Sequence, residues 1–239
     1  MLSGVAAGHV NPDAGTLTVR VFELVALLLW GSGILFLRRH PKPLYIGAYI
    51  GASTLALFDW AFNTRWFFNV SYDDSFLALW RIDGQVQPIA LCMTYAFYFG
   101  CPLLLAVHHR DRIDAALGRW AWPTVFLVSS LVNPLFEIPL VRWLHLWTYH
   151  QRSGFELAGV AWSNTWFSGL LFTSCYAAVR VALRWADATP AGSLPAKEIR
   201  WRDMAYGTAA IWCAFYVSMQ VQLIWYAVAT PWGDSPRPF

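Results

Sequence analysis

Residues 120–144 read WAWPTVFLVSSLVNPLFEIPLVRWL, a long apolar stretch with one acidic residue, Glu137, near its middle. An α-helix needs roughly 20 predominantly apolar residues to cross the hydrocarbon layer of a bilayer. This stretch is long enough, and it lacks the strict apolar–polar alternation that is typical of membrane barrel strands. We therefore predict a transmembrane helix over residues 120–144, with the carboxyl group of Glu137 inside it.

Five further apolar runs have the same character: residues 21–37, 43–63, 88–108, 157–183 and 204–229. The chain has 239 residues, of which 57% are hydrophobic and only 13% are charged. A soluble domain carries about twice that charged fraction. The fold class expected is all-α: a polytopic helical bundle in the cell membrane, with about six transmembrane helices that form one domain over residues 1–239.

Lysine and arginine residues predict the orientation of the bundle, because cytoplasmic connections carry an excess of them. The odd-numbered connections are the richer ones, with Arg38, Arg39, Lys42, Arg110, Arg112, Arg119, Arg184, Lys197, Arg200 and Arg202. The even-numbered connections have Arg65, Arg81, Arg142 and Arg152. We expect both termini to be extracytoplasmic. The net charge of +3 is small and spread over short connections, which argues against nucleic acid as a partner.

Polar residues recur at one depth, in the outer half of the predicted bundle. They are Glu23, Asp59, Asn63, Asn133, Glu137, Asn164, Gln220 and Gln222, from five different runs. Ionisable residues within a membrane span usually face the protein interior or a water-filled cavity. We expect a shared pocket at this depth. The aromatic connection at residues 64–87, which includes Tyr72 and Trp80, is predicted to cover it.

Some of these residues also have a purely structural interpretation. Glu23 can pair with Arg20 at the membrane interface, and Asn164 can form a hydrogen bond between helices. Gln220 and Gln222 point to different faces of a helix, so at most one of them lines the pocket.

The two buried acids are harder to explain structurally. Neither Asp59 nor Glu137 has a basic residue three or four positions away in its own run, so each needs a partner on another helix or stays protonated. Pro134 and Pro139 flank Glu137 and predict a kink there, because each proline removes a helical hydrogen-bond donor.

Metal and haem sites are not expected. The four cysteines, Cys92, Cys101, Cys175 and Cys213, form no CxxC pair. The histidines lie at different depths, with His108 and His109 at the inner end of one run and His145 and His150 at the outer side. The sequence therefore predicts no metal and no organic cofactor.

Two segments resemble the membrane-bound spirocyclases of the AveC type, which are linked to spiroketal formation. The first contains Leu57, Phe58, Asp59, Asn63, Phe68, Tyr72, Leu77, Trp80 and Pro88, and the second contains Phe136, Glu137, Ile138, Pro139, Leu140, Arg142 and Tyr149. The similarity covers roughly residues 57–98 and 133–172, in the same order. The general layout is also similar to that of fungal membrane-bound meroterpenoid cyclases. These resemblances imply a cyclase, of isomerase or lyase type, for a lipophilic polyketide or terpenoid substrate.

Acid–base catalysis fits these residues, because a carboxyl group in an apolar pocket can act as a general acid near neutral pH. Our hypothesis gives the catalytic roles to Asp59 and Glu137, in either order. Substrate binding is assigned to Asn63, Tyr72, Trp80, Asn133, Asn164 and Gln222, and aromatic faces could stabilise a cationic intermediate. A lipophilic small molecule and membrane lipid are the expected partners.

Two alternatives remain open at this stage. A small transporter or lipid-binding protein would need a polar path through both leaflets, and the inner half is poor in polar residues. An accessory subunit would need a lipid-facing stripe of small residues, which Gly31, Gly33, Gly47 and Gly51 could provide.

Overall fold

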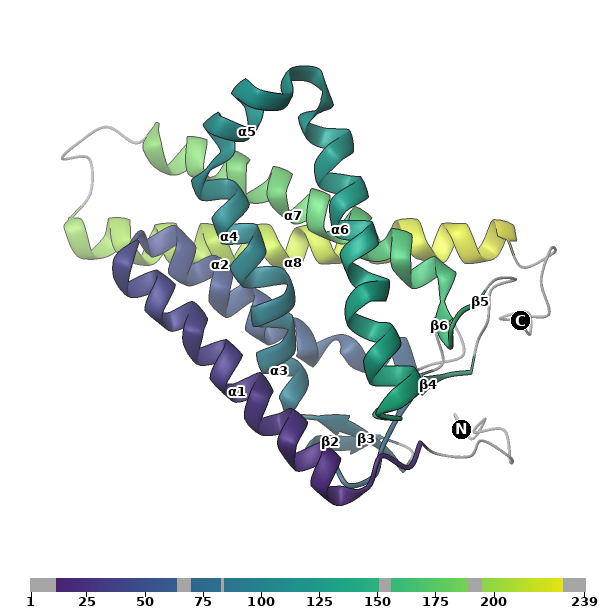
Figure 1. The fold of residues 1–239 in the computed structure, drawn as a ribbon. Helices are drawn as coiled ribbons and strands as arrows, with labels where there is room; N and C mark the ends of the chain where they lie inside the picture. The colour runs from purple at the N-terminus through teal and green to yellow at the C-terminus, as the bar shows by residue number, and fades with distance from the viewer. Residues whose placement is uncertain (1–11, 64–69, 83, 151–155, 189–194, 230–239) are drawn as a thin grey trace.

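The computed structural model describes residues 12–63, 70–82, 84–150, 156–188 and 195–229, and most of them are helical (Figure 1). The α-helices are α1 (Thr16–Arg39), α2 (Pro43–Thr54), α3 (Ala90–Tyr95), α4 (Cys101–His108), α5 (Arg110–Leu117), α6 (Ala121–Ile138), α7 (Trp162–Asp187) and α8 (Ala196–Ala229). The predicted all-α class therefore fits the described part of the chain.

Five helical segments of the described residues are long and apolar enough to cross a membrane. They are α1, the segment from α3 to α4, the segment from α5 to Trp143, α7, and α8 as far as Trp225. These segments agree with five of the six apolar runs. The five helical segments are therefore consistent with a membrane protein.

The sixth run, residues 43–63, differs from a straight transmembrane helix. Helix α2 ends at Thr54, and two 3₁₀ segments follow, η1 (Leu55–Leu57) and η2 (Asp59–Asn63). Ser53 and Thr54 are the last two residues of α2. The hydroxyl of each donates a hydrogen bond back to a carbonyl of the preceding turn. The expected count of six spans stays a prediction, since α2 alone is too short to cross hydrocarbon.

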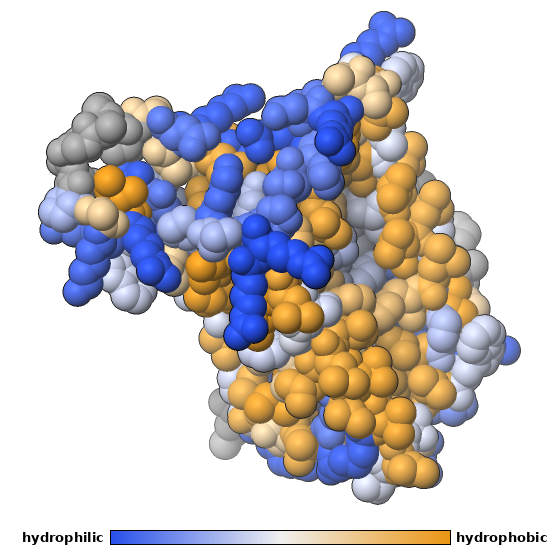
Figure 2. All heavy atoms as spheres, turned by 60° about the vertical axis from the view of Figure 1, so that its left-hand side comes forward, coloured by the Kyte–Doolittle hydropathy of each residue, from blue (hydrophilic) through white to orange (hydrophobic). Residues whose placement is uncertain are grey.

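An apolar surface surrounds the helices. Large hydrophobic side chains such as Leu28, Leu135 and Ile224 are more than half exposed. Figure 2 shows that hydrophobic residues cover the middle of the visible face, with hydrophilic residues gathered above and below them. A continuous apolar surface of this size in a single chain fits contact with lipid.

Helices α2 and α8 pack closely through glycines. A Cβ atom at Gly47 would overlap the carbonyl oxygen of Met204, and one at Gly207 would overlap the carbonyl oxygen of Leu44. The Thr208 hydroxyl donates a hydrogen bond to the Gly47 carbonyl, at 2.9 Å. Gly47 and Gly51 are thus buried within the chain, so the expectation that they offer a lipid-facing stripe for a partner helix is wrong.

Short antiparallel strands connect the helices at one end of the bundle. Strand β1 (Val70–Tyr72) pairs with β4 (Trp147–Tyr149), so that Tyr72 lies opposite Trp147. Strands β2 (Ala78–Ile82) and β3 (Gln85–Pro88) form a hairpin, and β5 (Glu156–Leu157) pairs with β6 (Val160–Ala161). These pairs were not anticipated, because the apolar runs dominate the sequence pattern.

The connection between η2 and α3 folds back onto the bundle, as expected for its described part. Glu23 of α1 forms the predicted ion pair with Arg20 and also accepts a hydrogen bond from the Leu77 amide, at 2.7 Å. Asp73 accepts a hydrogen bond from the Ala14 amide, at 2.6 Å. The start of α1 is therefore held to the strand end of the molecule, opposite α5 in Figure 1.

Candidate active site

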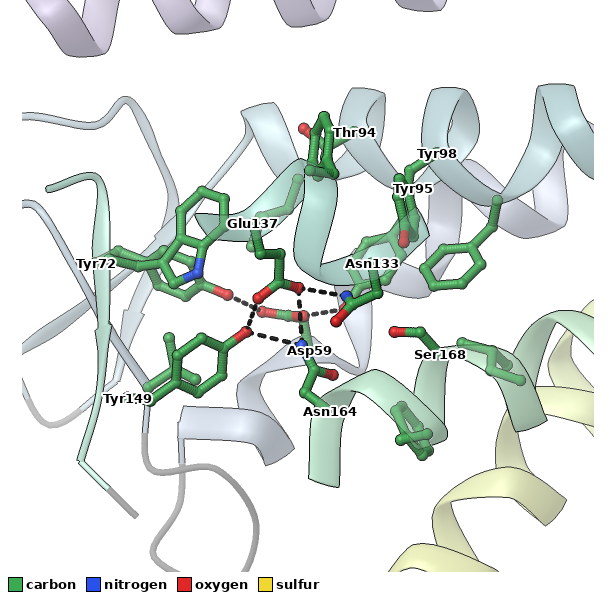
Figure 3. Close-up of a pocket in the computed structure, with 17 residues that line it drawn as sticks. Asp59, Tyr72, Thr94, Tyr95, Tyr98, Asn133, Glu137, Tyr149, Asn164 and Ser168 are labelled. Carbon is green, nitrogen blue, oxygen red and sulfur yellow. Dashed lines mark hydrogen bonds between the residues drawn. The ribbon is translucent and has the colours of Figure 1, made fainter. Parts of the chain in front are cut away.

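A small cavity lies where the helices meet the strands, and two carboxyl groups point into it (Figure 3). Asp59 begins η2, and Glu137 lies in the last turn of α6. The cavity has a volume of about 90 Å³, and its other walls come from β1, α3, β4 and α7. The expected convergence of Asp59 and Glu137 on one chamber is thus present in the fold.

Asp59 is buried and accepts three hydrogen bonds from neutral side chains. The Tyr72 hydroxyl and the Gln87 amide nitrogen each lie 2.8 Å from its Oδ2 atom. The Tyr95 hydroxyl donates to the other oxygen, Oδ1. Strand β1, strand β3 and helix α3 each supply one of these donors, so the position of the carboxyl depends on three separate elements.

Glu137 has a matching set of three neutral donors. The amide nitrogens of Asn133 and Asn164 lie 2.9 Å and 2.7 Å from its Oε1 atom. The Tyr149 hydroxyl donates to Oε2 and accepts a hydrogen bond from the Asn164 amide, at 2.9 Å. Asn164 therefore orients both the carboxyl group and its tyrosine partner.

The two carboxyl groups share a pattern that suits proton transfer. In each, one oxygen accepts an amide hydrogen bond, and the other has a tyrosine hydroxyl as its one partner among the described residues. An amide NH₂ group can only donate, whereas a hydroxyl can donate or accept. The oxygens beside Tyr95 and Tyr149 can therefore carry a proton without loss of their hydrogen bonds.

The β1–β4 pair forms one wall of the cavity. Side chains two residues apart on a strand share a face, and Val70, Tyr72, Trp147 and Tyr149 all line the cavity. Both tyrosines lie on strands outside the apolar helical segments. Burial raises the pKa of their hydroxyl groups well above the usual range, and the neighbouring carboxyl groups of Asp59 and Glu137 add to the shift. The tyrosines thus remain protonated hydrogen-bond partners at neutral pH.

Both helices beside the cavity lose regular α geometry at this depth. A π-helical turn, η3 (Ala96–Gly100), follows Tyr95, and another, η5 (Pro139–Trp143), follows Glu137. Pro139 cannot donate a helical hydrogen bond, which explains the change after Glu137. The change from α to π geometry begins at Pro139, one of the two prolines for which a kink was predicted. Single π turns within helices are frequent at functional sites.

No basic side chain neutralises the acids within the described residues. The ion pairs found there involve other carboxyl groups, such as Glu23 with Arg20 and Asp114 with Arg180. Among the same residues, no three histidine, cysteine or acidic side chains are grouped so that they could hold a metal ion. The site offers proton donors, proton acceptors and aromatic faces in an apolar setting.

Five of the eight predicted site residues line the cavity: Asp59, Tyr72, Asn133, Glu137 and Asn164. Trp80 and Gln222 are not among its lining residues, and their assignment to substrate binding stays a prediction. Trp80 lies on the β2–β3 hairpin, and Gln222 is buried in α8. The side chain of Asn63 lies outside the described residues.

Several residues of the site were missed by the sequence analysis as contributors to it. Tyr95 and Gln87 bind Asp59, Tyr149 binds Glu137, and Trp147 and Tyr98 line the cavity. Tyr95 and Tyr98 lie one helical turn apart in an apolar run, which was an available signal. The roles of Gln87 and Trp147 depend on strand pairing that the sequence did not reveal.

Comparisons with protein-family models, with curated proteins and with solved structures found no match to the chain. The resemblance to AveC-type spirocyclases therefore rests on the two sequence segments alone.

Proposed function

We propose that the chain is a membrane-embedded, cofactor-independent cyclase that acts by acid–base catalysis on a lipophilic polyketide- or terpenoid-like substrate, with spiroketal formation as the favoured reaction. One observation carries this proposal: Asp59 and Glu137, from separate elements, face one small cavity, and each is held by three neutral donors. Paired carboxyl groups in such surroundings are suited to give and take protons.

The residues that carry the family resemblance support the same reaction. Asp59 and Tyr72 come from the first similar segment, and Glu137 and Tyr149 come from the second. All four line the same cavity, although Asp59 and Glu137 are 78 positions apart in the chain. A pattern that was retained only for helix packing would not need to bring these four polar groups together.

Spiroketal formation from a ketone with two hydroxyl groups can proceed as follows. The first hydroxyl adds to the ketone carbon and gives a hemiketal. A neutral carboxyl group then donates its proton to the hemiketal hydroxyl, which leaves as water. The second hydroxyl bonds to the resulting oxocarbenium carbon and returns a proton to that carboxylate. The net change is the loss of one water.

The second carboxyl group has an electrostatic role in this scheme. In its ionised form it stabilises the positive charge of the oxocarbenium ion, and the ring faces of Tyr95 and Trp147 can contribute cation–π attraction. Asp59 and Glu137 have equivalent sets of donors, so the proposal gives one of them the acid role and the other the electrostatic role without fixing the order.

Transport remains the second candidate, and the lining of the neighbouring space argues against it. A neighbouring cavity, which Tyr98 also lines, extends toward α5 among mainly apolar side chains such as Val125, Val128 and Phe172. A transporter of polar solutes would need hydrogen-bonding groups along that path. An enzyme that takes a lipophilic substrate does not.

The test is a turnover assay on the protein in lipid nanodiscs. A lipophilic dihydroxyketone is supplied, and the dehydrated spiroketal is measured by mass spectrometry. Asp59→Asn and Glu137→Gln should each reduce the rate by about a thousandfold, the usual scale of a lost general acid or base. Full activity in both variants would overturn the proposal.

Two matched controls accompany these variants. Asp111→Asn and Glu198→Gln make the same chemical changes at exposed positions in α5 and α8. Both controls should retain wild-type turnover. Size-exclusion profiles of all four variants separate a loss of catalysis from a loss of folded protein.

A further inference from the structure

A second and larger cavity lies between α4, α5, α6 and α7. Its volume is about 350 Å³, whereas the cavity that contains the carboxyl groups has only about 90 Å³. Pockets for small organic ligands usually have 300–1,000 Å³. The carboxyl cavity alone is therefore too small for a lipophilic substrate, and most of such a molecule must lie elsewhere.

The two cavities are adjacent. Tyr98, Phe99 and Ser168 line both of them. Along α6, the lining runs from Thr124 in the larger cavity to Glu137 in the smaller one. Thr124 and Glu137 are thirteen positions apart, so at 1.5 Å per residue the helix between them is about 20 Å long. A molecule that passes the three shared side chains would place its reacting end at Glu137 and a long tail along α6.

The walls of the larger cavity are apolar. Pro102 and Ala106 of α4 face Val125 and Val128 of α6, and Phe172 of α7 closes the space between them. The hydroxyl of Ser129, one of the few polar groups, already donates to backbone carbonyls of its own helix. The cavity therefore favours hydrocarbon.

The cavity opens at the apolar surface. Val128 is 54% exposed and Val132 is 44% exposed, and both lie on the cavity wall midway along a helix that is apolar enough to cross a membrane. An opening at this depth faces lipid chains rather than water. It gives a hydrophobic molecule a direct path from the bilayer to the carboxyl groups.

A charged and aromatic cluster lies next to residues that line the larger cavity. Arg180 of α7 forms an ion pair with Asp114 of α5, at 2.5 Å, and lies over the rings of Trp122 and Tyr176. Asp114 is adjacent in sequence to Ile113, and Tyr176 lies one turn beyond Phe172, both of which line the cavity. The lining itself consists of other, mainly apolar side chains.

We propose that the cavity between α4 and α6 binds the hydrocarbon chain of a single-chain amphiphile that enters from the bilayer, with its polar, reacting end at Asp59 and Glu137. This inference rests on the proposed function, and it names the class of substrate: an oxygen-bearing head on one aliphatic or isoprenoid tail. The chain of the substrate is the occupant, and an acyl chain of a bilayer phospholipid is the competing occupant.

Photolabelling tests the proposal without any need for turnover. The probe is a hexadecanol analogue with a diazirine in its chain and a terminal alkyne, added to the protein in phosphatidylcholine nanodiscs. We expect labels on the facing walls of α4 and α6, and excess hexadecanol should suppress them. Val128→Phe should reduce labelling about tenfold relative to its matched control Leu127→Phe, which alters the lipid-facing side of the same helix.

A second pair of variants guards against a folding defect at Val128. Ala106→Phe fills the cavity from α4, and Leu105→Phe is its exposed neighbour. Equal labelling within both pairs would overturn the proposal, and so would labelling that excess hexadecanol does not suppress, since phospholipid would then fill the space. Asp111→Asn and Glu198→Gln, at exposed positions in α5 and α8, should keep full labelling. Site-specific labelling without dihydroxyketone turnover would refute the proposed reaction and leave the chain site standing.

Discussion

The carboxyl cavity and the α2–α8 interface show two opposite uses of a helical bundle. At the interface, regular helices approach so closely that only glycine fits at Gly47 and Gly207. At the cavity, 3₁₀ and π turns interrupt the helices, and buried carboxyl groups are held by tyrosine and amide side chains. The first arrangement buries backbone against backbone and leaves no room, whereas the second leaves space beside polar groups.

The comparison separates residues that stabilise the fold from residues that are expected to carry out the reaction. Buried polar groups weaken a fold unless all of them find partners, so a bundle that serves only as a scaffold does not need them. Close packing at glycines, in contrast, stabilises helix contacts in a membrane. Substitutions at the α2–α8 interface should therefore lower stability, and substitutions in the carboxyl cavity should lower turnover.

The largest effect, a loss of stability, is expected for substitutions at the α2–α8 interface. Gly47→Leu should prevent the close approach of α8 and abolish recovery of monodisperse protein, because the new side chain meets the backbone of Met204. Gly47→Ala should be milder and cost about 1–3 kcal/mol, the usual cost of overpacking. Thermal unfolding in detergent measures both variants.

The matched control for this prediction is Gly31→Ala in α1, where a Cβ atom would meet no neighbour within 4 Å. It should leave the melting temperature unchanged or raise it slightly. A melting temperature for Gly47→Ala that equals that of Gly31→Ala would show that the α2–α8 contact is looser than described.

The next largest effect is a loss of turnover when Tyr149, the tyrosine beside Glu137, is altered. Tyr149→Phe removes the hydroxyl that donates to Glu137 Oε2 and should lower turnover about tenfold to a hundredfold, as expected for a hydrogen bond to a charged group. Tyr216→Phe, on the exposed face of α8, should have no effect on turnover. Steady-state kinetics with the dihydroxyketone measure both rates, and equal rates would remove Tyr149 from the site.

A smaller effect is expected when Asn164 is altered. Asn164→Ala leaves Glu137 with the Asn133 amide on the same oxygen, so turnover should fall only about tenfold. The double variant Asn164→Ala/Tyr149→Phe should lose less than the product of the two single losses, because Asn164 also binds the Tyr149 hydroxyl. A fully multiplicative loss would mean that the two residues act independently.

The smallest effects are expected at the two predicted residues that lie off the cavity. Gln222 is fully buried, and its side-chain nitrogen and oxygen have no hydrogen-bond partner among the described residues. Gln222→Met should keep turnover and raise the melting temperature slightly, since it removes two unsatisfied polar atoms. Trp80→Phe should also keep turnover. A large loss of turnover in either variant would extend the site beyond the cavity.

Most of the helices could be predicted from the sequence, because length and hydrophobicity alone define a membrane span. The end of α2 could not, since the 3₁₀ turns after Thr54 lie within an apolar run, and hydropathy does not distinguish 3₁₀ from α geometry. The strands were also missed. Each is only a few residues long, and the β1–β4 pair joins segments far apart in the chain.

The candidate site could be predicted in part for a similar reason. Asp59, Glu137, Asn133 and Asn164 are conspicuous because polar residues are costly inside apolar runs. The spacing of Tyr95 and Tyr98 was a weaker signal, because tyrosines are common in membrane helices. Gln222 does not line the cavity, because depth along a helix does not determine which neighbour a residue faces, and the packing of α8 decides that.

A double-variant cycle on turnover tests the central claim most directly. Dihydroxyketone turnover is measured for wild type, Asp59→Asn, Glu137→Gln and the double variant in nanodiscs. If the two carboxyl groups act as one acid–base unit, the double variant should be no slower than the slower single variant, because groups that act together lose their effect together. Losses that multiply in the double variant, or wild-type turnover in either single variant, would contradict it.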